Sequence, residues 1–134
     1  MKIKKISHIA VAASDTEQSR VLFEDILGLH YSGSETVEQE GVTTHFFEVG
    51  ESSIEMLKPL SEDTPVGKFL EKRGPGMHHI ALEVEDLDGY VERLKGAGIP
   101  LLSETPKPGA HEMRIIFIHP KATGGVLIEL CEKS

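Results

Sequence analysis

The sequence is poor in cysteine and lacks long apolar runs. Its single cysteine, Cys131, has no partner within the chain, which excludes internal disulfides and is typical of a reduced, intracellular protein. No stretch approaches the ~20 apolar residues that a membrane span needs. The lysine-containing N-terminus is not followed by the apolar core of a signal peptide. We therefore expect a cytoplasmic protein.

Positive charge is also scarce. The chain has 14 lysines and arginines against 22 aspartates and glutamates, a net charge of −8. This charge repels nucleic-acid phosphates and anionic membrane surfaces, so we expect neither as a partner. An anionic small molecule is still compatible with the composition, because a local cation can outweigh a distant net charge that salt screens over about 10 Å.

What the sequence does contain is an internal repeat long enough to be half of a domain. Two pairs of strand-like runs match: Ser7–Val11 with His78–Leu82, and Ser53–Leu57 with Leu127–Cys131. In the first pair His79 follows His8 by 71 residues, and in the second Glu129 follows Glu55 by 74. The difference is the size of one loop insertion, so the two halves share the same order of elements.

The periodicity of apolar residues predicts the order βαβββ in each half. Helices are expected at 16–27 and 87–97, a connecting helix at 65–72, and further strands at 29–37, 42–49, 53–58, 101–104, 114–119 and 125–132. Neither half alone has enough apolar surface to close a core. We therefore predict one α+β domain over residues 1–134, with pseudo-symmetric modules at about 1–60 and 76–134, a helical linker at about 61–75 and one curved mixed sheet.

Four polar residues in these apolar strands need an explanation: His8, Glu55, His79 and Glu129. Because side chains alternate along a strand, all four point away from the face on which the helices pack. Alone, each is better explained as a hydrogen-bonded histidine or a solvent-facing glutamate. A buried carboxylate costs several kcal/mol unless it is compensated, and the recurrence of both residue types in two halves predicts one shared cation.

Two imidazole nitrogens and two carboxylate oxygens suit a divalent ion such as cobalt, nickel, manganese or zinc, without selecting one of them. A six-coordinate ion with four protein ligands would keep two adjacent positions for a bidentate oxygen ligand. Such an ion would act as a Lewis acid towards an enolate or enediolate.

Several motifs resemble the methylmalonyl-CoA epimerase family of the vicinal oxygen chelate superfamily, which also contains glyoxalases, bleomycin resistance proteins and dioxygenases. The resemblance covers nearly the whole chain. It is carried by His8–Ala12, Phe23–Leu29, Phe69–Gly74, Met77–Ala81 and the stretch from His119 through Leu130. The last stretch, with its HPK and GGVLIEL segments, is the most specific, whereas a strand that begins with histidine and isoleucine is common throughout the superfamily.

The resemblance implies that paired modules cup one divalent ion per chain, with cobalt the first choice and nickel, manganese or zinc as alternatives. Its ligands would be His8, Glu55, His79 and Glu129. The implied reaction is epimerisation of methylmalonyl-CoA through an enolate, with Glu129 as both ligand and catalytic base. An acyl-CoA substrate and a homodimer are also implied.

Inversion requires a proton delivered from the side opposite Glu129, and the residue that delivers it stays open. Some relatives are thought to use a second glutamate whose matching position here is Thr44. Glu48 shares a face with Thr44, displaced by roughly 7 Å, and it or a water could substitute. A solvated Glu48 beside the Gly50 turn is the slightly favoured interpretation.

Three alternatives to epimerisation share parts of this pattern. A glyoxalase acting on a glutathione hemithioacetal uses a similar ligand set, so the four residues do not separate it from an epimerase. Ring-cleaving dioxygenases of the superfamily use three protein ligands, which four candidates count against. A metal-free drug-binding protein of the same fold would line its cup with aromatics, but this chain has no tryptophan, two tyrosines and five phenylalanines.

Overall fold

The computed structural model describes residues 1–134 and has eight strands and three α-helices, the α+β class predicted from sequence. The strands are β1 (Lys2–Ala12), β2 (His30–Val37), β3 (Val42–Val49), β4 (Ser52–Pro59), β5 (Gly76–Glu85), β6 (Lys107–Pro108), β7 (Met113–Ile118) and β8 (Leu127–Lys133), and the α-helices are α1 (Thr16–Arg20), α2 (Pro65–Arg73) and α3 (Leu87–Gly96). Most bounds agree with the predicted ones to within two residues.

The chain forms two compact units. The N-terminal unit is His8–His78, and the C-terminal unit is His79–Ser134 together with Met1–Ser7. Strand β1 is shared by both, and the eight strands form one mixed sheet. That the two modules make a single domain stays a prediction.

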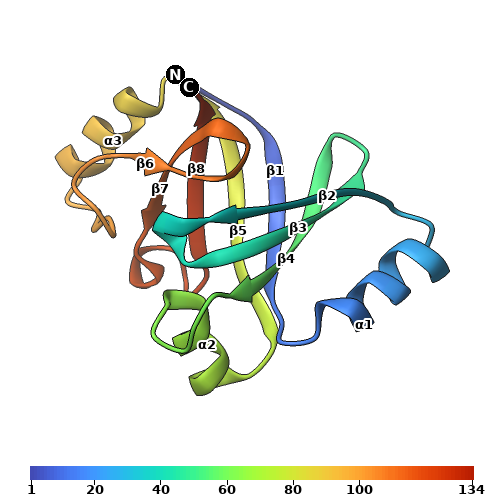
Figure 1. The fold of residues 1–134 in the computed structure, drawn as a ribbon. Coiled ribbons are helices and arrows are strands. Elements are labelled where there is room, and N and C mark those ends of the chain that lie inside the picture. Colours follow the sequence, from blue (N-terminus) through green and yellow to red (C-terminus); the bar gives the residue numbers. More distant parts are fainter. The chain divides into compact units, whose positions relative to one another are not determined.

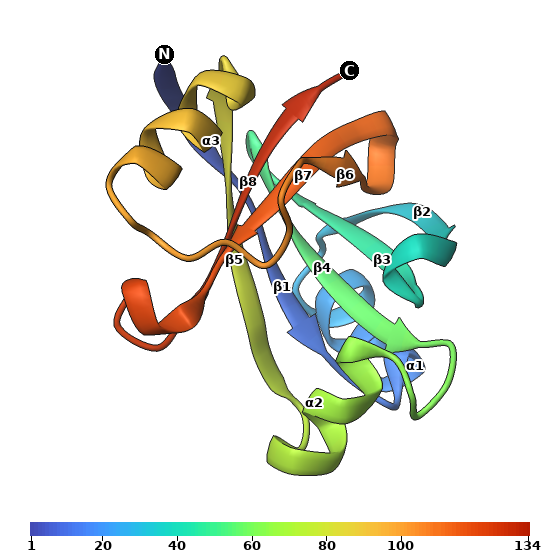
Figure 2. The same ribbon diagram turned by 90° about the vertical axis from the view of Figure 1, so that its left-hand side faces the viewer.

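Strands β2, β3 and β4 of the N-terminal unit are antiparallel neighbours, as Figure 1 shows, and β4 pairs with β1 in parallel. In the C-terminal unit, β5 pairs with β8 in parallel, and β7 lies antiparallel to β8 (Figure 2). Each unit therefore has the same arrangement, in which the first strand of a half pairs with the last one.

The register confirms the internal repeat. Ala10 of β1 lies opposite Glu55 of β4, and Ala81 of β5 lies opposite Glu129 of β8. Each glutamate thus lies beside the residue two positions after the repeated histidine. Alanine has a small side chain, so each carboxylate has an equivalent, small neighbour on the same face.

The first predicted helix forms but changes type along its length. The Asp15 carboxylate caps α1 by accepting the amide N–H of Gln18. From Val21 to Ile26 the helix continues as a π-helix, in which the Leu27 amide donates to the Leu22 carbonyl five residues earlier. The other two α-helices, α2 and α3, also form where the sequence predicts them.

The strand predicted at 101–104 is wrong. Only Leu101 makes a bridge, to Ile118, and the short strand β6 lies further on. Pro100 and Pro106 flank the segment and cannot donate to a ladder, and within it the Ser103 hydroxyl donates to the Thr105 carbonyl in a local bend.

The two faces of the sheet differ as the alternation predicts. In the C-terminal unit the face towards α3 buries Val84 and Ile116 with Leu87 and Val91 of that helix. The opposite face carries a separate cluster around Ala81, Ile115, Phe117 and Cys131. In the N-terminal unit Phe47 and Met56 pack with Ala13 on the face opposite to that of Glu55. Burial of these clusters, at about 25 cal/mol per Å² of apolar surface, stabilises the sheet that positions the polar residues.

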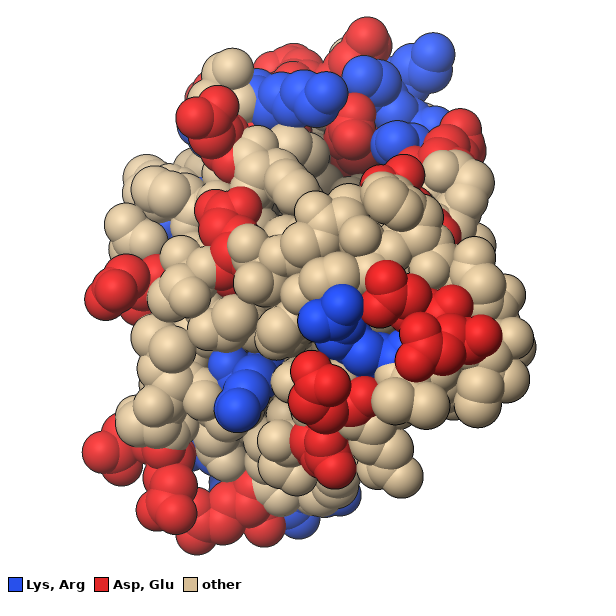
Figure 3. Space-filling view, turned by 45° about the vertical axis from the view of Figure 1, so that its right-hand side comes forward, with Lys and Arg blue, Asp and Glu red and all other residues tan.

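The surface agrees with the acidic composition. On the face drawn in Figure 3, acidic side chains lie next to the basic ones. Wide areas without charged residues separate these groups. No helix of this structure is long and apolar enough to cross a membrane.

Candidate metal centre

The N-terminal unit holds one buried histidine–glutamate pair. His8 of β1 and Glu55 of β4 are 9% and 6% exposed, and the Nδ1 of His8 lies 3.1 Å from the Oε2 of Glu55. The Ser53 hydroxyl donates to the same carboxylate oxygen at 3.4 Å. Strand β4 lies between β3 and β1, so Glu55 has a neighbouring strand on each side.

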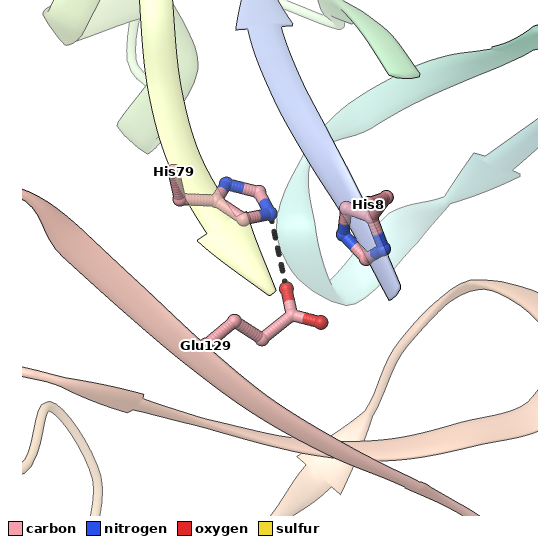
Figure 4. Close-up of side chains that lie close together, drawn as sticks. All are labelled: His8, His79 and Glu129. Atoms are coloured by element: carbon pink, nitrogen blue, oxygen red, sulfur yellow. Dashed lines mark ion pairs between the residues drawn. The ribbon is translucent and has the colours of Figure 1, made fainter. Parts of the chain in front are cut away.

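The C-terminal unit holds a second pair of the same kind. The Nε2 of His79 lies 3.1 Å from the Oε1 of Glu129, and both residues are 5% exposed (Figure 4). The edge of the His79 ring contacts the ring of Phe117, whose centroid is 5.3 Å away. This contact restricts the imidazole and so holds the nitrogen near the carboxylate.

All four predicted residues are therefore buried, and each carboxylate has an imidazole within ion-pair distance. A buried carboxylate costs several kcal/mol unless positive charge or hydrogen bonds compensate it. A protonated imidazole or a divalent ion can supply that charge. The donor atoms, imidazole nitrogen and carboxylate oxygen, fit the divalent ions expected from the sequence.

The two positions considered for a second acid, Thr44 and Glu48, do not offer a buried carboxylate. Thr44 is 2% exposed and has no group that titrates. Glu48 has a side chain that is 52% exposed, and its Oε2 lies 3.6 Å from the Nε2 of His30, which is also exposed. The solvated interpretation of Glu48 is thus the one that its surroundings support.

Sequence analysis did not consider Glu35, which the structure pairs with Thr44 across β2 and β3. The pairing depends on an extra residue in β2, between Tyr31 and Gly33. Strand alternation read from the sequence assumes no such irregularity, so it could not place Glu35 on a face.

A second polar cluster lies in the N-terminal unit, on the helix-covered face. The guanidinium of Arg20 lies 3.9 Å from the Tyr31 ring centroid, and the Tyr31 hydroxyl lies 2.8 Å from the Nδ1 of His45. Burial lowers the pKa of His45, and the nearby charges of Arg20 and Lys58 lower it further.

This lowered pKa predicts that stability falls as the medium becomes acidic. Below the ordinary value of 6.5 the unfolded chain binds a proton that folded His45 does not, and the loss continues until the pH reaches the lower folded-state pKa. Replacing His45 with glutamine should therefore reduce the acid-induced loss of stability. Urea unfolding at neutral and at mildly acidic pH measures it, with His30→Gln as an exposed control. An equal loss in the parent and the His45 variant would contradict the assignment.

The chain is similar in sequence to known proteins of one superfamily. Residues 7–117 match the Glyoxalase/Bleomycin resistance protein/Dioxygenase superfamily, and the chain belongs to that superfamily. Among its relatives, the ethylmalonyl-CoA/methylmalonyl-CoA epimerase of Cereibacter sphaeroides is 39% identical over 130 residues, which cover 96% of this chain and 97% of the relative. The mitochondrial methylmalonyl-CoA epimerase of Homo sapiens is 40% identical over 127 residues, 94% of this chain and 72% of the relative.

A solved structure extends the similarity to the backbone. Streptomyces coelicolor methylmalonyl-CoA epimerase in complex with 2-nitronate-propionyl-CoA matches with a TM-score of 0.93 at 32% identity, covering 98% of this chain and 96% of that one. The resemblance stated from sequence motifs is thus confirmed over nearly the full length.

Proposed function

We propose that this protein interconverts the two epimers of methylmalonyl-CoA. The observation that carries the proposal is the similarity, over nearly the whole chain, to proteins named as epimerases of methylmalonyl-CoA or ethylmalonyl-CoA. The buried histidine–glutamate pairs support it, because removal of a proton next to a thioester needs a buried base and a compensating positive charge.

One divalent ion per chain, with cobalt as the first choice, would be held by His8, Glu55, His79 and Glu129. Support comes from the two buried histidine–glutamate contacts, because imidazole nitrogens and carboxylate oxygens are ligands that these ions accept. The contact of 3.1 Å between Glu55 and His8 supports Glu55 as a fourth ligand. When bound, a divalent ion supplies Lewis-acid stabilisation of negative charge on a carbonyl oxygen.

The chain's own residues would then move the proton. The Glu129 carboxylate accepts the proton from the carbon between the thioester and the free carboxylate, and the electron pair moves towards the thioester oxygen. Burial of Glu129 excludes water from the reacting carbon, and the contact with His79 orients the carboxylate. A positioned base of this kind contributes about 10² to 10⁴ in rate.

We also propose that the protein is a cytoplasmic homodimer. The sequence has a single cysteine, the buried Cys131, so no disulfide can form within the chain, which supports a reducing compartment. The family resemblance supports the dimer, and Val21, Leu22, Ile26 and Leu27 are apolar yet 45–70% exposed. Sedimentation at micromolar protein concentration should give twice the chain mass of 14.7 kDa. A fully active monomer would contradict the dimer.

The test of function uses the purified parent protein with each epimer of methylmalonyl-CoA in deuterium oxide. We expect exchange of the alpha proton and formation of the other epimer, followed by mass spectrometry and NMR. The same preparation is assayed with a glutathione hemithioacetal. Turnover of the hemithioacetal without exchange of either epimer would replace the proposal by a glyoxalase activity.

A further inference from the structure

The two halves of the repeat differ at the residue two positions before each buried glutamate. In the N-terminal unit this residue is Ser53, whose hydroxyl donates to the Oε2 of Glu55 at 3.4 Å. In the C-terminal unit the equivalent residue, two positions before Glu129, is Leu127. A leucine side chain cannot donate a hydrogen bond, so the two carboxylates have chemically different neighbours.

Leu127 lies beside both proposed ligands of its unit. It is opposite His79 in the parallel register of β5 and β8, and neighbouring strands are about 4.8 Å apart. Because side chains alternate along a strand, Leu127 shares the face of Glu129, about 7 Å away along β8. Leu127 is only partly buried, so part of this residue stays accessible to a ligand.

The other neighbours of Glu129 on this face are apolar too. Cys131 follows it by two residues on β8, and Ala81 of β5 and Phe117 of β7 lie directly opposite it. These three residues belong to one buried cluster, and Leu127 packs against that cluster. Phe117 is 8% exposed, and Ala81 and Cys131 are 0% exposed. Leu127 is therefore the apolar neighbour of Glu129 that a ligand can reach most readily.

An alkylmalonyl thioester has one apolar substituent that suits such a face. Its alpha carbon carries a hydrogen, an alkyl group, the thioester and a free carboxylate, and the last two need positive charge or hydrogen-bond donors. A base that accepts the alpha proton lies about 3 to 3.5 Å from the reacting atom. The alkyl group is one bond away from the alpha carbon, so it falls within reach of the apolar residues around Glu129.

We propose that Leu127 contacts the alkyl group of the substrate and sets the length of alkyl group that is accepted, an inference that rests on the proposed function. A shorter side chain at this position makes room for a longer alkyl group and loses contact with a methyl group. One methylene in an apolar contact changes kcat/KM by about 10- to 200-fold. The substrate class is thus the 2-alkylmalonyl-CoA thioesters, and Leu127 discriminates among them.

The experiment compares methylmalonyl-CoA and ethylmalonyl-CoA as substrates of the purified protein. In Leu127→Ala the ratio of kcat/KM for ethylmalonyl-CoA to that for methylmalonyl-CoA should rise about 10-fold or more above the parent ratio. Bound metal per chain should be unchanged, because leucine offers no ligand atom. Leu127→Val removes a single methylene and should shift the ratio in the same direction by less, which tests the proposal even if the alanine variant does not fold.

The matched control is Ile128→Ala, at the next residue of β8. Ile128 has as many side-chain carbons as Leu127 but packs on the opposite face, against the cluster that contains Leu87 and Val91 of α3. Its substitution should leave the ratio at the parent value.

If the Leu127 variants keep the parent ratio, or lower kcat/KM for both substrates equally, Leu127 does not contact the alkyl group. A parent protein that epimerises neither substrate overturns the epimerase function itself, and this inference with it. An active parent with an unchanged ratio in both Leu127 variants overturns only this inference, so the two failures are distinguishable.

Discussion

Replacing His79 with alanine should abolish retention of a divalent ion by the purified protein. The substitution removes one of the proposed nitrogen ligands. It also removes the imidazole whose Nε2 lies 3.1 Å from the carboxylate of Glu129, a residue that is 5% exposed. Groups that merely orient a ligand already contribute 10- to 100-fold to metal affinity, so loss of a direct ligand should cost about 100-fold or more.

The measurement is metal content per chain after dialysis, by mass spectrometry, followed by titration with cobalt. The parent should retain about one ion per chain, as the single proposed site requires. His30→Ala is the matched control, because His30 is a strand histidine that is 72% exposed and should not affect retention. Unchanged stoichiometry and affinity in the His79 variant would mean that the ion, if any, binds elsewhere.

The positions of the four candidate ligands could be predicted from sequence because two simple rules apply to them. Strand alternation separated His8 and Glu55 from the apolar face, and the repeat assigned the same face to His79 and Glu129. Both rules hold where strands are regular, and the registers of β1 with β4 and of β5 with β8 are regular. Alternation alone predicts the face of each side chain but not its burial, which depends on the residues packed over that face.

The features that sequence missed are those in which the backbone departs from regular periodicity. The segment expected as a strand at 101–104 forms a single bridge, and the second half of the first predicted helix is a π-helix, with a hydrogen bond between residues five apart. The bulge near Gly33 reversed the face of Glu35. Each of these features is local to a few residues, so the periodicity of apolar residues over a whole element does not predict it.

The last prediction concerns Glu129, for which the proposed function gives two roles that one substitution separates. Glu129→Gln should keep an oxygen near the proposed metal ligands, since an amide oxygen still offers lone pairs, but an amide cannot accept a proton at neutral pH. Loss of a general base should lower turnover by about 10² to 10⁴, or roughly 3 to 5 kcal/mol of barrier. Exchange should be lost from the epimer whose alpha proton Glu129 accepts.

Glu55→Gln is the matched control, because Glu55 is equally buried and paired with a histidine but has no proposed role in accepting the proton. Its turnover should therefore fall far less. Exchange in deuterium oxide is followed for each epimer, with metal content measured on the same samples, so that a lost ion is distinguished from a lost base. If Glu129→Gln retains its metal and exchanges both epimers at the parent rate, another group removes the proton and Glu129 acts only as a ligand.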